Sequence, residues 1–198
     1  MKVLILSPYP ERIKFALRQE GDDPVEFNGT PSEWPTQEFD FVVSYGYRHI
    51  IREPLLSRYT GRLANLHISY LPWNRGPSPN FWSWYDDTPK GVTIHLVDSG
   101  VDTGPIVARM EANDFGPNST YKSSYDYLHF LAGLLFLQTW PALRSGTWTE
   151  FVDNDWRHSG SLRTWRDLKA VLGSTEIDPQ MSVSEIERLG RMARTAGK

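Results

Sequence analysis

Short apolar runs alternate with segments of helical periodicity along the first two thirds of the chain. The runs are rich in β-branched and aromatic residues and are bounded by turn-forming residues, a pattern typical of buried strands. The predicted strands cover residues 2–7, 24–27, 39–45, 62–68, 91–97, 105–110 and 147–152. Residues 28–37 are dominated by turn formers, so a loop is predicted there.

The helical segments repeat their apolar residues every three or four positions. The longest of them, residues 119–145, places Tyr121, Tyr125 and Leu128 on one face. A helix over residues 50–59 must hold Pro54 near its first turn, because Pro has no backbone N–H to donate. The predicted helices cover residues 11–20, 50–59, 77–86, 119–145, 162–172 and 182–196.

The order of these elements predicts the fold class. Strand and helix alternate, which favours an α/β fold with a Rossmann-like, mostly parallel sheet flanked by helices. The strands at 91–97 and 105–110 follow each other as a hairpin-like pair, so the sheet is expected to be mixed. A length of 198 residues fits one main domain. We expect it to cover residues 1–145, followed by a short C-terminal extension over residues 146–198.

Composition narrows the classes of partner. Hydrophobic residues make up 39% and charged residues 23% of the chain, as in ordinary globular proteins. The net charge is −3 with both signs interspersed, so nothing favours a nucleic-acid surface, which needs clustered Lys and Arg. No apolar run has membrane-spanning length, and residues 1–8 are too soon interrupted by Pro to be a signal peptide. These features favour a cytoplasmic protein that binds a small molecule, with no membrane partner; a homodimer is left open.

Candidate chemistry centres on two polar stretches. Asn65 and His67 stand two residues apart in a predicted strand, so their side chains share one face. Pro72 then ends the strand and sends the chain into a loop. Further on, Asp102 lies between two glycines at 100 and 104. Together these residues offer an amide donor, a base near neutral pKa and an anion that can orient it.

Each of these residues also has a structural interpretation. His67 alone would more often be a satisfied structural histidine, and Asp102 alone would be an ordinary turn aspartate. Their combination with Asn65 favours catalysis. His95 stands among apolar residues and is expected to be a packing residue. The chain has 0 Cys and its histidines lack metal-ligand spacing, so no metal site is expected.

The two stretches resemble the formyltransferase family that uses 10-formyltetrahydrofolate. Its hallmark is Asn-x-His-x-Ser-x-Leu-Pro followed by Asp-x-Gly-x-Asp-x-Gly, and both stand here, at residues 65–72 and 98–104. The chain departs from many members at Ile68 and Tyr70, where Pro and Leu are common. Residues 71–76 and 89–95 look most like the sugar N-formyltransferases and the formylation domain of gramicidin synthetase. The resemblance implies a catalytic domain over residues 1–145.

The resemblance also implies roles for particular residues. Asn65 and His67 would donate hydrogen bonds to the oxyanion, and Asp102 would hold His67 protonated and take part in proton transfer. The formyl donor would be 10-formyltetrahydrofolate, and no metal is required. The donor would contact Arg48, His49, Ile50, Ile51, Val97, Asp98, Gly100 and Val101. The acceptor would approach Trp73, Asn74 and Arg75, of which Arg75 suits a phosphate.

The resemblance leaves the acceptor open. A primary amine of a nucleotide-linked amino sugar is preferred, and an amino acid, free or on a peptide-synthetase carrier, and glycinamide ribonucleotide are the alternatives. Hydrolysis of the formyl donor would use the same residues. The acidic balance counts against transfer RNA. A folate-binding module without catalysis is the non-enzyme alternative. A dinucleotide-binding protein is disfavoured, because Ser7-Pro8-Tyr9-Pro10-Glu11 stands where a glycine-rich turn would be.

Overall fold

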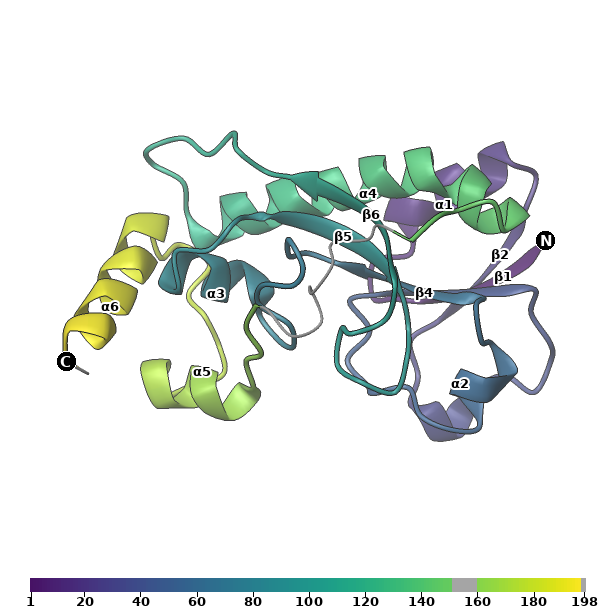
Figure 1. The fold of residues 1–198 in the computed structure, drawn as a ribbon, viewed down its shortest axis with the longest axis horizontal. Helices are drawn as coiled ribbons and strands as arrows, with labels where there is room; N and C mark the ends of the chain where they lie inside the picture. The colour runs from purple at the N-terminus through teal and green to yellow at the C-terminus, as the bar shows by residue number, and fades with distance from the viewer. Residues whose placement is uncertain (151–159, 197–198) are drawn as a thin grey trace. The chain divides into compact units, whose positions relative to one another are not determined.

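The computed structural model describes residues 1–150 and 160–196. In this part of the chain a 6-stranded sheet has the order β2-β1-β3-β4-β5-β6 (Figure 1). The pairs β1–β2, β1–β3 and β3–β4 are parallel and β4–β5 is antiparallel, which confirms the predicted mixed, mostly parallel sheet. The strands are β1 (Lys2–Leu6), β2 (Asp23–Phe27), β3 (Phe41–Tyr45), β4 (Leu63–His67), β5 (Gly91–Leu96) and β6 (Ile106–Glu111).

The helices follow the predicted order, with differences at their ends. The helix predicted at 50–59 is confined to α2, because Pro54 occupies its N-cap and residues 50–53 stay outside. The predicted loop at 28–37 contains one short helical turn, η1 (Pro31–Glu33), closed by a capping box between Thr30 and Glu33. The other helices are α1 (Glu11–Gln19), α2 (Leu55–Arg58), α3 (Pro79–Tyr85), α4 (Tyr121–Ser145), α5 (Trp165–Leu172) and α6 (Val183–Ala196).

The strand predicted at 147–152 is not formed where it can be described. Residues 147–150 adopt no regular structure, and residues 151–152 lie outside the described residues. The apolar residues there are few, and no neighbouring strand edge pairs with residues 147–150. None of the helices in the described part of the chain combines the length and hydrophobicity that a membrane span requires.

Contacts divide the chain into two compact units. The first comprises Met1–His67, Thr93–Arg109 and Ala132–Val152, and the second comprises Ile68–Val92, Met110–Leu131 and Asp153–Lys198. The sequence predicts a catalytic domain over residues 1–145 and a C-terminal extension over residues 146–198. This boundary says which part of the chain carries the catalytic activity, so it stays a prediction.

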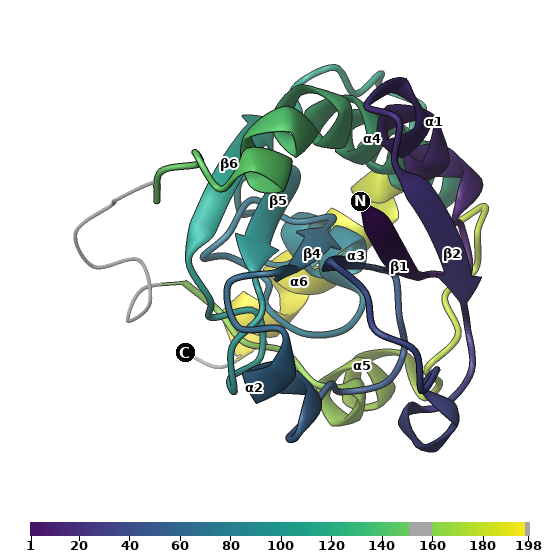
Figure 2. The same ribbon diagram turned by 90° about the vertical axis from the view of Figure 1, so that its right-hand side faces the viewer.

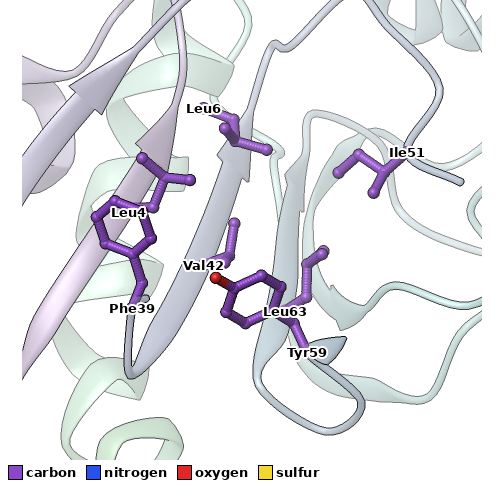
Figure 3. Close-up of a cluster of buried hydrophobic side chains, with 7 residues drawn as sticks. All are labelled: Leu4, Leu6, Phe39, Val42, Ile51, Tyr59 and Leu63. Carbon is purple, nitrogen blue, oxygen red and sulfur yellow. The ribbon is translucent and has the colours of Figure 1, made fainter. Parts of the chain in front are cut away.

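The first unit has helices on both faces of its parallel strands. α1 and the C-terminal half of α4 lie side by side on one face, and α2 lies on the other (Figures 1 and 2). Every residue of β3 is buried, as expected of a parallel strand covered on both sides. On the α2 side, a cluster of seven side chains fills the layer (Figure 3). Its members are Leu4, Leu6, Phe39, Val42, Ile51, Tyr59 and Leu63.

The second unit is organised around the short aromatic helix α3. All seven residues of α3 are buried. Phe81, Trp82, Trp84 and Tyr85 pack with Leu168 of α5 and with Val183 and Ile186 of α6. Trp82 and Trp84 are thus core residues. A seven-residue helix is too short to be stable alone, so this packing must hold it.

The segment that follows β4 is braced by the C-terminal part of the chain. The backbone N–H of Arg75 donates to Ser161 O at 2.9 Å, and that of Arg163 donates to Arg75 O at 2.9 Å. Arg75 and Leu162 form a parallel bridge. The C-terminal residues thereby determine the conformation of a segment almost ninety positions earlier in the chain.

Candidate active site

Strand β4 carries the first two candidate residues. Asn65 and His67 are separated by one residue, so the pleat directs both side chains to one face. His67 is the last residue of β4 and is 8% exposed. The parallel strands β1, β3 and β4 end at the same edge of the sheet, where open α/β sheets bind ligands. The fold therefore buries a titratable side chain at a favourable position for chemistry.

The loop between β5 and β6 brings a carboxylate to this face. Asp102 Oδ2 lies 3.7 Å from His67 Nε2, and Asp102 Oδ1 lies 3.4 Å from Asn65 Nδ2. The backbone of Asp102 has a φ of 51°, a left-handed conformation that Asp adopts more readily than most residues. The structure thus brings the three predicted residues together around one point.

Two features of the loop hold Asp102 in place. Asp98 Oδ1 accepts hydrogen bonds from Gly100 N at 3.0 Å and from Thr103 Oγ1 at 2.7 Å, so the Asp98 side chain closes the turn from within. Gly104 allows a close backbone approach, because a Cβ there would lie 1.9 Å from Leu96 O. Both features keep the loop folded back over β4.

His95 is the residue that the sequence did not assign to the site. It is 2% exposed, its Nε2 lies 3.2 Å from Asn65 Nδ2 and 3.4 Å from Asp102 Oδ1, and its ring faces that of His67 edge-on. Its Nδ1 lies 2.7 Å from Leu96 O, and because a carbonyl can only accept, Nδ1 carries the proton. In the neutral ring Nε2 is then an acceptor for the Asn65 amide. His95 packs in the core, as expected, and it also orients a candidate catalytic side chain.

A signal for His95 exists in the sequence. In an antiparallel pair, residues directly opposite each other share a face of the sheet. Asn65 stands opposite His95, and His67 stands opposite Thr93. To place His95 opposite Asn65 from the sequence, one would need the register between β4 and β5. No pattern within either strand specifies that register.

The two segments predicted to contact the formyl donor border the same apolar cluster. Ile51 is part of the cluster shown in Figure 3, and Tyr47 and Val97 pack against it. Each segment exposes one apolar side chain, Ile50 at 60% and Val101 at 42%. Arg48 and His49 are exposed on the first segment. Two exposed aliphatic groups beside backbone turns suit a flat, partly apolar ligand.

Tyr47 immediately precedes the first of these segments. Burial raises the pKa of Tyr47, with a further contribution from the charge of Glu33. Its hydroxyl donates to Gly29 O at 2.8 Å, so the residue is a neutral anchor for the chain that leads into residues 48–51.

The three predicted acceptor contacts differ in their surroundings. Asn74 is 0% exposed, and its amide donates to Thr88 Oγ1 at 2.7 Å and accepts from Ser161 Oγ at 3.3 Å. This side chain acts within the protein, so a direct contact with an acceptor would require it to move. Trp73 is partly exposed. Arg75 has a buried Nε that makes no hydrogen bond within the described residues, which leaves this guanidinium suited to an anion.

No group of three His, Cys, Asp or Glu side chains in the described ranges is arranged to hold a metal ion. The groups that the candidate site offers are the amide of Asn65, the imidazoles of His67 and His95, and the carboxylate of Asp102.

A mostly parallel sheet that gathers Asn65, His67 and Asp102 around one point defines an α/β protein with a candidate acid–base site. The chain belongs to the formyl transferase family, whose sequence model matches residues 31–139. The methionyl-tRNA formyltransferase of Myxococcus xanthus is 36% identical over 108 residues, which are 54% of this chain and 34% of that enzyme. The chain thus matches about a third of the length of that curated relative.

Solved structures agree with the family assignment. The formyltransferase PseJ from Anoxybacillus kamchatkensis, in complex with UDP-4,6-dideoxy-4-formamido-L-AltNAc and tetrahydrofolate, is 34% identical with a TM-score of 0.84. The match covers 94% of this chain and 97% of that one. A 4-N formyltransferase from Francisella tularensis is 18% identical with a TM-score of 0.67, covering 96% of this chain and 85% of that chain, and it shares the fold. The predicted family is confirmed.

Proposed function

We propose that this protein is an N-formyltransferase that moves a formyl group from 10-formyltetrahydrofolate to a primary amine. The preferred acceptor is the amine of a nucleotide-linked amino sugar. The observation that carries the proposal is the convergence of Asn65, His67 and Asp102 in a chain of the formyl transferase family. A cytoplasmic location remains part of this proposal.

The residues of the site match what formyl transfer requires. The donor supplies an electrophilic formyl carbon, and attack by an amine places negative charge on the formyl oxygen. His67, buried and facing Asp102, would donate a hydrogen bond to that oxygen in its protonated form. Asn65 would add the second donor, because its contact with Asp102 Oδ1 is long at 3.4 Å and this N–H could be shared with the formyl oxygen while the other stays on His95.

Asp102 would serve both orientation and proton transfer. Its two oxygens face different partners, Oδ2 toward His67 and Oδ1 toward His95 and Asn65. A carboxylate so placed can stabilise the imidazolium form of His67. It can also accept the proton that the attacking amine must lose, directly or through one water.

The donor proposal rests on Ile50 and Val101. These exposed aliphatic groups flank two backbone segments that meet at one apolar cluster. The faces of a pteridine ring would pack against such groups, and backbone N–H and C=O groups would bind its polar edge. Asp98 is engaged in closing its own loop, so we assign its contact with the donor to the backbone.

Two observations support a nucleotide-linked sugar as the acceptor. PseJ, which is 34% identical over nearly the whole of both chains, was crystallised with a UDP-linked formamido sugar. Arg75 offers a guanidinium whose Nε has no partner in the described chain, and a diphosphate would satisfy it. Methionyl-tRNA and glycinamide ribonucleotide formyltransferases are also relatives, so both classes of acceptor belong in the test.

The test is a folate-release assay with a panel of amines. The protein would be given 10-formyltetrahydrofolate with nucleotide-linked amino sugars, glycinamide ribonucleotide, amino acids or methionyl-tRNA. We expect release of tetrahydrofolate that depends on an amino sugar nucleotide, with a formylated product identified by mass. Release without any amine would indicate hydrolysis instead. Folate binding without release in every arm would favour a binding module.

The variant that tests the catalytic role proposed for His67 is His67→Ala. Loss of the imidazole should lower kcat on the order of 10²- to 10³-fold, the range found when one donor to an oxyanion is removed. The affinity for the donor should change little, because the folate segments lie elsewhere in the first unit. Arg75→Gln is the contrasting variant, since it should raise the acceptor KM with a smaller effect on kcat. A normal kcat in His67→Ala would overturn the catalytic assignment.

A further inference from the structure

Strand β3 carries a polar side chain next to Asn65. Ser44 pairs with Asn65 of β4 in the parallel register, and it pairs with Leu6 of β1 on its other side. Because residues paired across neighbouring strands point to the same face of a sheet, the Ser44 side chain lies on the face that carries Asn65 and His67. Val42, two positions earlier on this face, belongs to the apolar cluster of Figure 3. The apolar side chains of β3 on this face thus give way to a hydroxyl at the position beside Asn65.

The hydroxyl of Ser44 is nearly buried and unpaired. Ser44 is 6% exposed, and its side chain makes no hydrogen bond within residues 1–150 and 160–196. Burying a hydroxyl without a partner destabilises the folded state, whereas an apolar residue would carry no such penalty. The other residues of β3 are aromatic or β-branched, which is the composition that favours a buried strand. Packing alone therefore does not explain this serine.

The amide of Asn65 has an unused acceptor at its other end. Both of its hydrogen bonds run from Nδ2, toward His95 Nε2 at 3.2 Å and Asp102 Oδ1 at 3.4 Å. Its Oδ1 accepts no hydrogen bond in the part of the chain that the structure describes, although an amide oxygen can accept two. A planar group that is held only at its nitrogen can still tilt. These two contacts alone therefore leave the direction of the N–H groups incompletely determined.

We propose that Ser44 is a positioning residue that donates its hydroxyl hydrogen to Asn65 Oδ1, directly after rotation about its Cα–Cβ bond or through one bridging water. This inference rests on the proposed formyl transfer. The two groups are complementary, since the hydroxyl supplies the donor that the amide oxygen lacks. Neighbouring strands lie about 4.8 Å apart, a gap that a change of serine rotamer or a single water can close. His95 would then hold the nitrogen end of the amide and Ser44 the oxygen end.

Such a contact would act on the reaction through Asn65. A donor at Oδ1 polarises the amide and strengthens its N–H groups as donors, because hydrogen bonds in a chain reinforce one another. It also holds the plane of the amide, so less reorganisation is needed when negative charge develops on the formyl oxygen. Ser44 itself would touch neither the formyl donor nor the acceptor amine.

The first experiment compares two variants of nearly equal size. Ser44→Thr keeps the hydroxyl, and Ser44→Val replaces it with a methyl group, so only the hydrogen-bonding group differs between them. In the folate-release assay Ser44→Val should lower kcat on the order of 10-fold, because a tilted amide is a weakened donor and not a lost one. The KM for the formyl donor should change little, and Ser44→Thr should keep most of the wild-type kcat.

The same pair of variants distinguishes positioning from packing. If Ser44 were a packing residue, valine would be tolerated at least as well as threonine, because the position is buried. Ser44→Ala adds no atoms and should lower kcat as Ser44→Val does, and thermal unfolding would establish that each variant is folded. Equal kcat in Ser44→Thr and Ser44→Val, or a change confined to the KM of the formyl donor, would overturn the proposal.

A second experiment tests the contact without turnover. The side-chain amide signals of Asn65 in proton–nitrogen correlation spectra can be identified by their absence from Asn65→Ala. They should shift in Ser44→Val and stay near their wild-type positions in Ser44→Thr. Ser83→Ala is the control, since Ser83 is a buried serine whose hydroxyl donates to Asn80 O within α3. It should leave the Asn65 signals unchanged.

The spectra also separate this inference from the proposed function. Identical Asn65 signals in Ser44→Val and Ser44→Thr would show that the contact is not made. A wild type that transfers no formyl group would contradict the proposed function alone, because the spectra do not depend on activity.

Discussion

At the scale of single residues, the site is a small network with His95 at its buried end. The imidazole donates from Nδ1 to Leu96 O and accepts from Asn65 at Nε2. It therefore determines which way the Asn65 amide points, and the same Nδ2 also donates to Asp102 Oδ1, at 3.4 Å. In the proposed reaction, His95 would touch no substrate but would set the geometry of Asn65, which would.

In the proposed reaction, His95 would therefore act as a positioning residue. His95→Phe removes the acceptor for Asn65, so the amide can rotate, and kcat should fall on the order of 10²-fold. His95→Gln can place its side-chain oxygen near the lost Nε2 and should recover part of the activity. Steady-state kinetics of the proposed formyl transfer would measure both.

The comparison between the two variants separates positioning from packing. Thermal unfolding of both variants serves as the control, since the ring is buried. If Phe and Gln lowered kcat equally at similar stability, the orienting role would be wrong. A change confined to the acceptor KM would also contradict it.

At the scale of elements, the sequence predicts strands and helices well where hydrophobic periodicity is strong. β1, β3, α1 and α4 are found within a few residues of their predicted bounds. The prediction at 147–152 was wrong for residues 147–150, because a short alternating pattern becomes a strand only where a partner edge exists. The pairing of the loop after β4 with residues 161–163 could not be predicted from the sequence. It is made by backbone hydrogen bonds, which require no particular pattern of side chains.

Asn74 stabilises the pairing between the loop after β4 and residues 161–163. Its amide bonds Thr88 and Ser161, and its backbone has a φ of 58°, which Asn tolerates better than Ala. Asn74→Ala should lower the free energy of unfolding by about 2–4 kcal/mol, from lost buried hydrogen bonds and left-handed strain. Asn74→Gly should lose about 1 kcal/mol less, because glycine relieves the strain.

Urea denaturation of both variants would check this prediction. Ser161→Ala is the control for the hydrogen bonds, since it leaves the backbone at Asn74 unchanged. Equal stability of Asn74→Ala and wild type would mean that the pairing does not need this side chain.

At the scale of the whole molecule, one buried carboxylate ties distant parts of the first unit together. Asp22 precedes β2, has a fully buried side chain, and accepts from Trp140 Nε1 at 2.8 Å and from Arg144 Nε at 3.0 Å, both on α4. Burial raises the pKa of Asp22, but hydrogen bonds from the Met1 amino group, Trp140 and Arg144 outweigh it, so the pKa is lowered overall. The charged form is therefore the one that the folded state stabilises.

The sign of the pH dependence follows. A pKa lowered by folding contributes stability above the unfolded value of about 3.9, and the contribution is lost as the pH falls through the folded pKa. Asp22→Asn should lower the free energy of unfolding at neutral pH by about 3 kcal/mol, because it leaves Arg144 without its partner. Chemical denaturation between pH 7 and pH 3 would measure this.

The same series contains its own control. The difference between wild type and Asp22→Asn should shrink below about pH 4, first because the unfolded wild type takes up a proton there, and at lower pH because the folded carboxyl is protonated as well. A difference that stays constant down to pH 3 would show that the charge of Asp22 is not what stabilises the fold.

The sequence by itself determined the family, the α/β class and the identity of the candidate catalytic residues. Asn65, His67 and Asp102 could be named because a short motif carries them, and strands could be placed because their hydrophobic period is local. The tertiary structure decided what depends on register and pairing: the place of His95 opposite Asn65, the burial of Asn74, and the place of Ser44 beside Asn65. These features arise from contacts between residues far apart in the chain. The free energy of such contacts depends on the geometry of the folded chain, which no local pattern specifies.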